Sequence, residues 1–340
     1  MTSSILSRSV RLRRFRNAAN QALQTYGLEA ARITFIAHSE NVTYRINGAE
    51  GRYLLRLHAP HHPGAVCAGT QTEPMIASEL LWLAALRREA RLPVPEPVAD
   101  CRGRFVHLAT VEGGPEPIPV TLMRWMEGRF PGARLTLEHC RRAGALMAQL
   151  HNHSAAWTPP AGFQRPAWDW ASFESSLSEM EALTDRPPTY LTLTREQVAV
   201  FRACVARIRE TTQILGTDRS EWGLIHADLH PGNLLFHRGE ARAIDFSRCG
   251  FGHFVYDIAE CCRFIGAERR RAFAEGYRRF RSLPEQFHEL LEAFFIRGWI
   301  ENVGFHAPNP KEQEWLSAAV PPFVERLEET YLQGEQMVTR

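Results

Sequence analysis

The residues from His226 to Phe246 combine the side chains that phosphoryl transfer needs. Asp228, Asn233 and Asp245 follow one another at spacings of five and twelve residues. Transfer from a metal-bound nucleotide needs one carboxylate that accepts or orients the proton of the acceptor hydroxyl. It also needs an amide and a second carboxylate that hold Mg²⁺ against the polyphosphate. A short loop with Asp and Asn, followed by a hairpin that returns a second Asp, would deliver all three to one place.

The residues after Asp228 predict that hairpin. Pro231 and Gly232 form a turn that brings Asn233 back toward Asp228. The expected strand, glycine-containing turn and return strand are Asn233–Phe236, His237–Glu240 and Ala241–Ile244. Asp245 then stands at a strand end, where functional side chains are usually exposed. The alternative is a polar hairpin with incidental acids, but the combined pattern is too specific to favour it.

Three stretches resemble the aminoglycoside phosphotransferase and choline kinase superfamily, which is related to the protein kinases. They are LMAQLHNHSAAW, GLIHADLHPGNLLF and IDFSRCGFGHFVYDIAE. The resemblance covers about residues 33–305 and is strongest to the bacterial branch of stress-response kinase A and homoserine-kinase-like proteins. It implies an α+β, two-lobed protein-kinase-like fold with a small antiparallel-sheet N-lobe and a larger, mostly helical C-lobe. It also implies that Asp228 is the catalytic acid/base and that Asn233 and Asp245 bind the metal.

The resemblance further implies a set of ATP-binding residues in the first third of the chain. Arg56, in the expected third strand, stands where relatives carry a phosphate-binding lysine, and Glu79 on the next helix is its expected partner. Arginine keeps its charge and can bind phosphate through two hydrogen-bond donors. A surface arginine on an edge strand is the alternative. The glycine-free loop 38–41, with Ser39, is expected to cover the phosphates, although a plain hairpin turn fits it nearly as well.

The segment Thr121–Gly128 resembles the linker whose backbone hydrogen-bonds adenine. The expected contacts are backbone groups of Arg124 and Met126, with Met123 at the back of the nucleotide pocket. Backbone contacts leave little trace in side chains, so these three assignments depend on the resemblance alone.

Further residues near the motif also have expected roles. His226 is expected to brace the loop by hydrogen bonding. Asp257 and Glu260 form a capping-box-like Asp-x-x-Glu pattern, so we expect Asp257 to cap a helix, with orientation of the catalytic loop as the alternative. Arg248 departs from the family, because many relatives carry further acids after the metal-binding Asp. Its effect on substrate choice is open.

The composition is that of an ordinary cytoplasmic enzyme. The net charge of only +2 gives no reason to expect nucleic acid or a membrane as a partner, and a monomer or homodimer is expected. Seven cysteines without a CxxC pair argue against a disulfide framework. The arginine-rich start resembles an organelle transit peptide, but a basic helix over residues 9–26 is favoured, since Lys311 is the only lysine in the chain.

The pattern of apolar residues predicts two lobes with a cleft between them. Strands and one helix are expected in residues 1–124, the nucleotide-binding lobe, and helices dominate residues 125–340, the catalytic and acceptor-binding lobe. The expected strands are 33–36, 42–46, 52–58, 105–110 and 118–123, and the expected helices are 74–91, 195–215, 268–280, 285–305 and 323–333, with another opening at Thr136.

The predicted function is ATP- and Mg²⁺-dependent transfer of the γ-phosphate to a hydroxyl of a small molecule. A Ser/Thr protein kinase and a nucleotide-binding pseudokinase are the alternatives. No dense acidic cluster lies in the helical part near the motif, so a polycationic aminoglycoside is a less favoured phosphate acceptor. Candidate walls of an acceptor site are Trp168, Asp169, Trp170, Trp299, Glu301 and His306, although core packing is the favoured explanation for the shared helix face of Trp299, Asn302 and His306.

Overall fold

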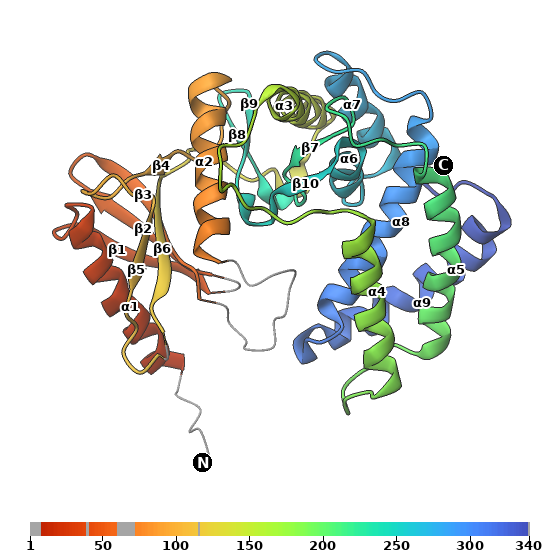
Figure 1. The fold of residues 1–340 in the computed structure, drawn as a ribbon, viewed down its shortest axis with the longest axis horizontal. Helices are drawn as coiled ribbons and strands as arrows, with labels where there is room; N and C mark the ends of the chain where they lie inside the picture. The colour runs from red at the N-terminus through yellow and green to blue at the C-terminus, as the bar shows by residue number, and fades with distance from the viewer. Residues whose placement is uncertain (1–7, 39–40, 60–71, 115, 339–340) are drawn as a thin grey trace. The chain divides into compact units, whose positions relative to one another are not determined.

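The computed structural model describes residues 8–38, 41–59, 72–114 and 116–338, which fall into two compact units (Figure 1). Unit 1 comprises residues 1–89, 94–127 and 161–164. Unit 2 comprises residues 90–93, 128–160 and 165–340. The assignment of nucleotide binding to one part and acceptor binding to the other stays a prediction.

Unit 1 is an antiparallel sheet with two helices. The sheet has the strand order β1-β2-β3-β6-β4, and β5 pairs with β6 beside β4. The strands are β1 Arg32–His38, β2 Val42–Gly48, β3 Gly51–Leu57, β4 Pro97–Val98, β5 Val106–Ala109 and β6 Ile118–Arg124. The helices are α1 Arg8–Thr25 and α2 Glu73–Glu89. Apart from the two-residue β4, each of these elements lies where the apolar pattern predicts it.

The alternation of side chains along β3 explains how the two helices cover the sheet. Leu55 and Leu57 are fully buried in a cluster with Ala18, Ala22 and Leu23 of α1. Because successive side chains of a strand point to opposite faces, Arg56 projects to the other face, where it meets Glu79 of α2. The two helices therefore cover opposite faces of the sheet, as the red and orange ribbons of Figure 1 show. The basic N-terminal segment is a packed helix, as expected.

Unit 2 is mostly helical. Its helices are α3 Leu137–Ala156, α4 Trp170–Asp185, α5 Arg195–Thr212, α6 Phe254–Cys262, α7 Ala267–Arg278, α8 Phe287–His306 and α9 Gln313–Glu329. Helix α8 is buried on all sides, because α4, α5, α6 and α9 contact it. Helices α3 and α7 cross so closely that a Cβ on Gly144 would lie 2.0 Å from the Phe273 oxygen. A Cβ on Gly276 would lie 1.9 Å from the Arg141 oxygen, so glycine is required at both positions.

Two short sheets of two strands each carry the motif residues of unit 2. Strand β8 (Leu234–His237) pairs antiparallel with β9 (Glu240–Ala243), with Leu234 opposite Ala243 and His237 opposite Glu240. Gly239 makes the turn with a φ of 84°, so the expected hairpin is confirmed. Strand β7 (Trp222–Ile225) pairs with β10 (Gly250–His253), and neither was expected from the sequence. The two sheets hold the loops on either side of the hairpin in place.

Two helices differ from the sequence expectation. Helix α4 was not predicted, and it begins where the Asp169 side chain accepts a hydrogen bond from the Ser172 amide. Helix α9 begins ten residues before the expected 323–333 and continues through Pro321 and Pro322. Each proline removes one backbone donor from the helix. The buried side chains that compensate recur at helical spacing: Leu316, Val320, Phe323, Val324 and Leu327.

The described cysteines form no disulfide, and the described helices are too short or too polar to span a membrane. All six cysteines of the described residues are free thiols, and all but Cys101 are buried. Within the described part of the chain, no helix combines the length and the apolar character that a membrane span requires.

Candidate functional site

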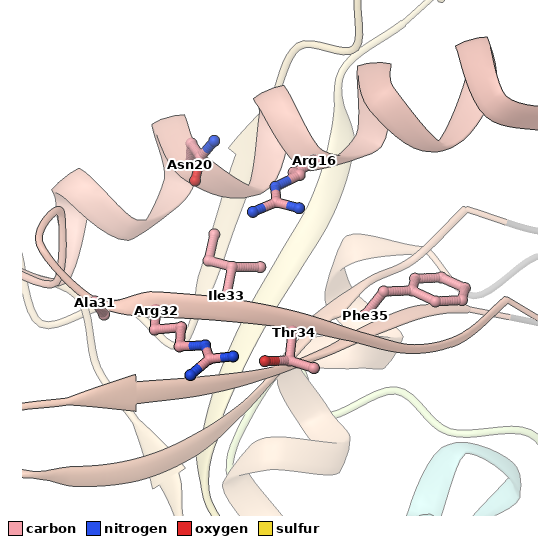
Figure 2. A pocket seen from close by; sticks show the side chains of 7 residues that line it. All are labelled: Arg16, Asn20, Ala31, Arg32, Ile33, Thr34 and Phe35. Carbon is pink, nitrogen blue, oxygen red and sulfur yellow. The ribbon is translucent and has the colours of Figure 1, made fainter.

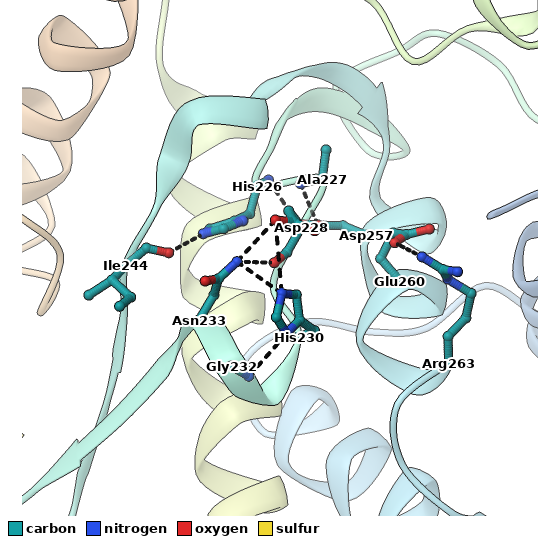
Figure 3. Close-up of polar contacts among 10 residues, drawn as sticks. All are labelled: His226, Ala227, Asp228, His230, Gly232, Asn233, Ile244, Asp257, Glu260 and Arg263. Atoms are coloured by element: carbon teal, nitrogen blue, oxygen red, sulfur yellow. Dashed lines mark hydrogen bonds and ion pairs between the residues drawn. The ribbon is translucent and has the colours of Figure 1, made fainter. Parts of the chain in front are cut away.

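Asp228 and Asn233 lie in direct contact in the loop between β7 and β8 (Figure 3). The Asn233 Nδ2 amide donates to the Asp228 Oδ2 at 3.0 Å and to the Asp228 backbone oxygen at 2.9 Å. A 3₁₀ turn, Pro231–Asn233, makes this possible by turning the chain back on itself. Because Nδ2 faces Asp228, the Oδ1 oxygen of Asn233 is left to bind another group.

Backbone hydrogen bonds bring Asp245 next to this pair. The backbone amide of Ile244 donates to the backbone oxygen of Asn233 at 3.0 Å. The His226 Nε2 donates to the backbone oxygen of Ile244 at 3.0 Å. Asp245 follows at once and has a left-handed backbone, with φ 61° and ψ 69°. The structure therefore gathers Asp228, Asn233 and Asp245 within unit 2, and His226 braces the loop as expected. Burial lowers the pKa of His226 despite the nearby carboxylates, so its imidazole is a neutral donor.

Asp257 does not cap a helix, which corrects the expectation from its Asp-x-x-Glu pattern. Helix α6 begins at Phe254, three residues before Asp257. The fully buried Asp257 carboxylate instead accepts the Ala227 amide at 2.8 Å and the His226 amide at 3.0 Å. Ala227 has a left-handed φ of 61°, an unfavourable conformation for alanine. Asp257 thus holds a strained backbone directly before Asp228, which is the orienting role that the sequence left as the alternative.

A second layer fixes the Asp257 carboxylate itself. The His151 Nε2 donates to the Asp257 Oδ2 at 3.0 Å, and the Tyr277 hydroxyl lies 2.8 Å from the His151 Nδ1. Burial would raise the pKa of Asp257, but hydrogen bonds from His151 and the His226 amide hold it below its usual value. Burial lowers the pKa of His151. An ionised Asp257 beside a neutral His151 satisfies every donor in this chain of contacts.

The loop after Asp245 is held by side chains from the segment that precedes α4. Arg165 donates to the backbone oxygens of Ser247 and Cys249. The Trp168 Nε1 donates to the Arg248 oxygen at 3.1 Å. Three successive carbonyls are therefore fixed by two side chains. Neither Arg165 nor this role of Trp168 was expected, because nothing in the sequence links the two segments.

The remaining candidate walls have structural roles as well. The Asp169 side chain caps α4. The Glu301 carboxylate accepts hydrogen bonds from the Arg297 guanidinium and the Tyr256 hydroxyl. Trp299 stacks on Trp315 and Phe323, at ring-centroid distances of 6.3 and 4.6 Å, which is the core packing favoured for it.

In unit 1, Arg56 and Glu79 form a buried ion pair. The Arg56 Nη1 lies 3.3 Å from the Glu79 Oε1, and the two residues are 5% and 1% exposed. Met123 is buried in β6 opposite Leu54. The Arg124 amide donates to the Glu96 oxygen at 2.8 Å, whereas the Met126 amide has no hydrogen-bond partner among the described residues. Ser39 lies outside the described residues, so its role stays a prediction.

A separate hollow of about 610 Å³ lies beside α1 and β1 of unit 1 (Figure 2). Its lining residues are Arg16, Asn20, Ala31, Arg32, Ile33, Thr34 and Phe35. None of the predicted site residues is among them, and its arginines are exposed on the surface. The hollow is therefore not the candidate site.

Comparison with known proteins assigns most of the chain to one family. The model of the phosphotransferase enzyme family matches residues 32–291. A homoserine kinase of Polaromonas naphthalenivorans (strain CJ2) is 26% identical over 288 residues, which cover 79% of this chain and 80% of that protein.

Two solved structures extend the comparison. The structure of the microcompartment-associated aminopropanol kinase matches with a TM-score of 0.72 and 28% sequence identity. The match covers 92% of this chain and 98% of the chain of that kinase. An amicoumacin kinase, in complex with AMP-PNP and Ca²⁺, has a TM-score of 0.73 and 19% identity over 95% of this chain and 96% of its own. The expected α+β, protein-kinase-like fold is confirmed. This chain is a kinase-class enzyme that belongs to the phosphotransferase enzyme family.

Proposed function

We propose that the protein transfers the γ-phosphate of ATP to a hydroxyl of a small molecule, in a reaction that requires Mg²⁺. The observation that carries the proposal is the contact of Asp228 with Asn233, together with the backbone bond that places Asp245 beside them. One carboxylate for the acceptor and an amide–carboxylate pair for the metal are the parts that phosphoryl transfer uses.

Asn233 and Asp245 would hold the Mg²⁺ ion. Mg²⁺ binds oxygen ligands, and the free Oδ1 of Asn233 and the Asp245 carboxylate supply them. The described residues contain no group of three or more His, Cys, Asp or Glu side chains that could cage a metal by themselves. Two protein ligands fit an ion that completes its shell with nucleotide phosphates and water. When bound, the ion would neutralise charge that develops on the phosphates.

Asp228 would accept the proton of the acceptor hydroxyl. The acceptor oxygen then forms a bond to the γ-phosphorus while the bond to the β-phosphate oxygen breaks, and ADP leaves. The Asn233 amide donates to one oxygen of Asp228, whose side chain is about 27% exposed and can therefore be reached by an acceptor. Asp257 contributes indirectly, because it fixes the backbone from which Asp228 projects.

Groups in unit 1 would bind the nucleotide. Arg56 would contact its phosphates, and the buried Glu79 would fix the guanidinium in place. The unpaired Met126 amide would donate to adenine, and the Arg124 carbonyl would accept from it, since the Arg124 amide is already used by Glu96. Met123 would line the back of this adenine site, and Ser39 would donate to phosphate.

The relatives favour a small molecule over a protein as the acceptor. Those described above are named after homoserine, aminopropanol and amicoumacin, and all three names denote small molecules that carry hydroxyl groups. No described feature favours a Ser/Thr protein acceptor.

ADP release from ATP tests this function directly. The purified chain is given ATP with Mg²⁺ or with EDTA, and acceptors are tested as a panel: amino alcohols, hydroxylated amino acids, choline, aminoglycosides and a Ser/Thr-rich protein. We expect ADP and a phosphorylated small molecule only when Mg²⁺ is present. Phosphate found only on the protein acceptor, or an absence of ATP binding, would contradict the proposal.

A further inference from the structure

Arg248 is a charged residue of unit 2 to which the proposed mechanism gives no role. It lies three residues after Asp245, in the short 3₁₀ turn Phe246–Arg248. Its backbone is fixed by the Trp168 Nε1, which donates to the Arg248 oxygen. Its side chain is therefore presented from a rigid loop rather than a mobile one.

Two aromatic rings hold the Arg248 guanidinium. Its Cζ lies 4.7 Å from the centroid of the Trp168 ring and 5.6 Å from that of Phe305. Cation–π contacts orient a guanidinium but satisfy none of its N–H donors. The Arg248 Nε is buried and has no hydrogen-bond partner among the described residues. A buried donor normally has a partner, so the guanidinium keeps hydrogen-bonding capacity for a further acceptor.

Other charges near Arg248 are already paired with one another. Glu260 forms an ion pair with Arg263, with 2.6 Å between Oε2 and Nη2. Glu301 forms an ion pair with Arg297, with 2.9 Å between Oε1 and Nη2. No carboxylate of the described residues lies within 4.0 Å of the Arg248 nitrogens. Arg248 is thus a cation that no described acid neutralises directly, although it lies in the field of several.

Arg248 stays charged and is coupled to Asp228. Burial alone would lower the pKa of Arg248, but the negative charge of Asp228, together with Tyr256, Glu260 and Glu301, raises it above its usual value. Of these groups Asp228 has the strongest effect, so the field of the proposed catalytic carboxylate reaches the guanidinium. The acids around it would repel a dianion, whereas a monoanion with one carboxylate matches a single cation.

We propose that Arg248 binds the carboxylate of the phosphate acceptor, and that the acceptor is a hydroxylated amino acid. The substrate's carboxylate accepts two hydrogen bonds from the guanidinium, and its hydroxyl lies at Asp228. A planar guanidinium matches a carboxylate with two parallel donors, which an ammonium group cannot do. This inference depends on the proposed phosphotransferase function, which it narrows to one class of acceptor.

Matched pairs of acceptors test the inference, because each amino acid has a counterpart that lacks only the carboxylate. The pairs are L-homoserine with 3-aminopropan-1-ol, L-threonine with 1-aminopropan-2-ol, and L-serine with ethanolamine. We expect the wild-type protein to phosphorylate at least one acid with a higher kcat/KM than its counterpart. In Arg248→Gln the ratio of kcat/KM for the amino acid to kcat/KM for its amino alcohol should fall by about 100-fold, because a desolvated charge pair is lost. Arg248→Lys should retain part of the ratio.

Arg281→Gln is the matched control. Arg281 is also an arginine of unit 2 stacked on an aromatic ring, Phe254, at 4.5 Å, but it donates to Asn152 and to the Ser220 oxygen. Its loss should leave the acid-to-alcohol ratio unchanged, and thermal melting of each variant with AMP-PNP and Mg²⁺ reports whether it is folded.

Three outcomes overturn the inference: turnover of none of the acids, a wild-type preference for the amino alcohols, or a ratio that Arg248→Gln leaves intact. If an acceptor without an anionic group is phosphorylated, the phosphotransferase function survives this failure. If the wild-type protein neither binds AMP-PNP nor releases ADP with any acceptor, the proposed function fails as well.

Discussion

Replacing Asp257 with asparagine would disturb Asp228 without touching it. The Asp257 carboxylate accepts three donors, the amides of His226 and Ala227 and the His151 Nε2. Asparagine has one oxygen, so its amide group must face at least one of these N–H donors. If the oxygen faces His226 and His151, the Ala227 amide is left unpaired inside the protein. The left-handed Ala227 then loses the contact that stabilises its strained backbone.

The size of the effect follows from these contacts. Leaving one buried donor unpaired costs about 1–3 kcal/mol, and the two remaining bonds weaken because their acceptor is no longer charged. We therefore expect Asp257→Asn to lower the unfolding free energy of unit 2 by about 2–4 kcal/mol. A relaxed backbone at Ala227 moves Asp228, and a displacement of about 1 Å at a catalytic group reduces kcat by about 100-fold.

Two measurements separate these effects, and a second aspartate supplies the control. Hydrogen exchange of a peptide that covers residues 222–234 should become faster, and kcat for the best acceptor should fall. Asp100, in unit 1, likewise accepts two backbone amides, those of Arg102 and Arg104, at 2.9 Å each. Asp100→Asn should speed exchange locally but leave kcat nearly unchanged. Equal exchange in wild type and Asp257→Asn, or an unchanged kcat, would refute the positioning role of Asp257.

Three further predictions concern packing, pH and the nucleotide. Gly276→Ala should lower stability by about 1–3 kcal/mol in urea unfolding, because its Cβ would meet the Arg141 oxygen at 1.9 Å, whereas Gly266→Ala, with no atom within 4 Å, should cost less than about 1 kcal/mol. Burial lowers the pKa of His253 to about 4, so the unfolded chain binds a proton first as the pH falls below about 6.5. Between pH 7.5 and 5 the wild-type protein should therefore lose about 2 kcal/mol more stability than His253→Phe, and parallel pH curves would contradict this. Arg56→Gln should raise the KM for ATP by at least about 10-fold and Arg56→Lys by less, whereas an unchanged KM in both would exclude a phosphate contact.

The sequence predicted the local features of the site well. Asp228, Asn233 and Asp245 belong to a loop and a hairpin whose turn residues and strand residues lie next to each other in the chain, and the strands of that hairpin lie within one residue of the expected bounds. The Arg56–Glu79 contact was also predicted, because the family resemblance supplied a cation on the third strand and a glutamate on the next helix. Local patterns are informative when the interacting residues are close in sequence or when a known family supplies the spacing.

Contacts between distant segments were not predictable in the same way. Asp257 lies 31 residues from His226 and 106 from His151, and its Asp-x-x-Glu pattern describes a helix start equally well. Strand β10 has only four residues, two of them glycine, and so carries no strand signal of its own. It forms because β7 offers it a hydrogen-bonding edge.

An Asp228→Asn variant separates proton acceptance at Asp228 from the geometry of its loop. Asparagine has almost the same shape, and its side-chain oxygen can still accept the Asn233 amide, so the loop should keep its geometry. It cannot accept a proton from the acceptor hydroxyl. We therefore expect kcat with the best acceptor to fall by at least about 100-fold, while the Kd for AMP-PNP with Mg²⁺ stays near the wild-type value. Turnover at the wild-type rate in a folded Asp228→Asn protein would contradict this expectation.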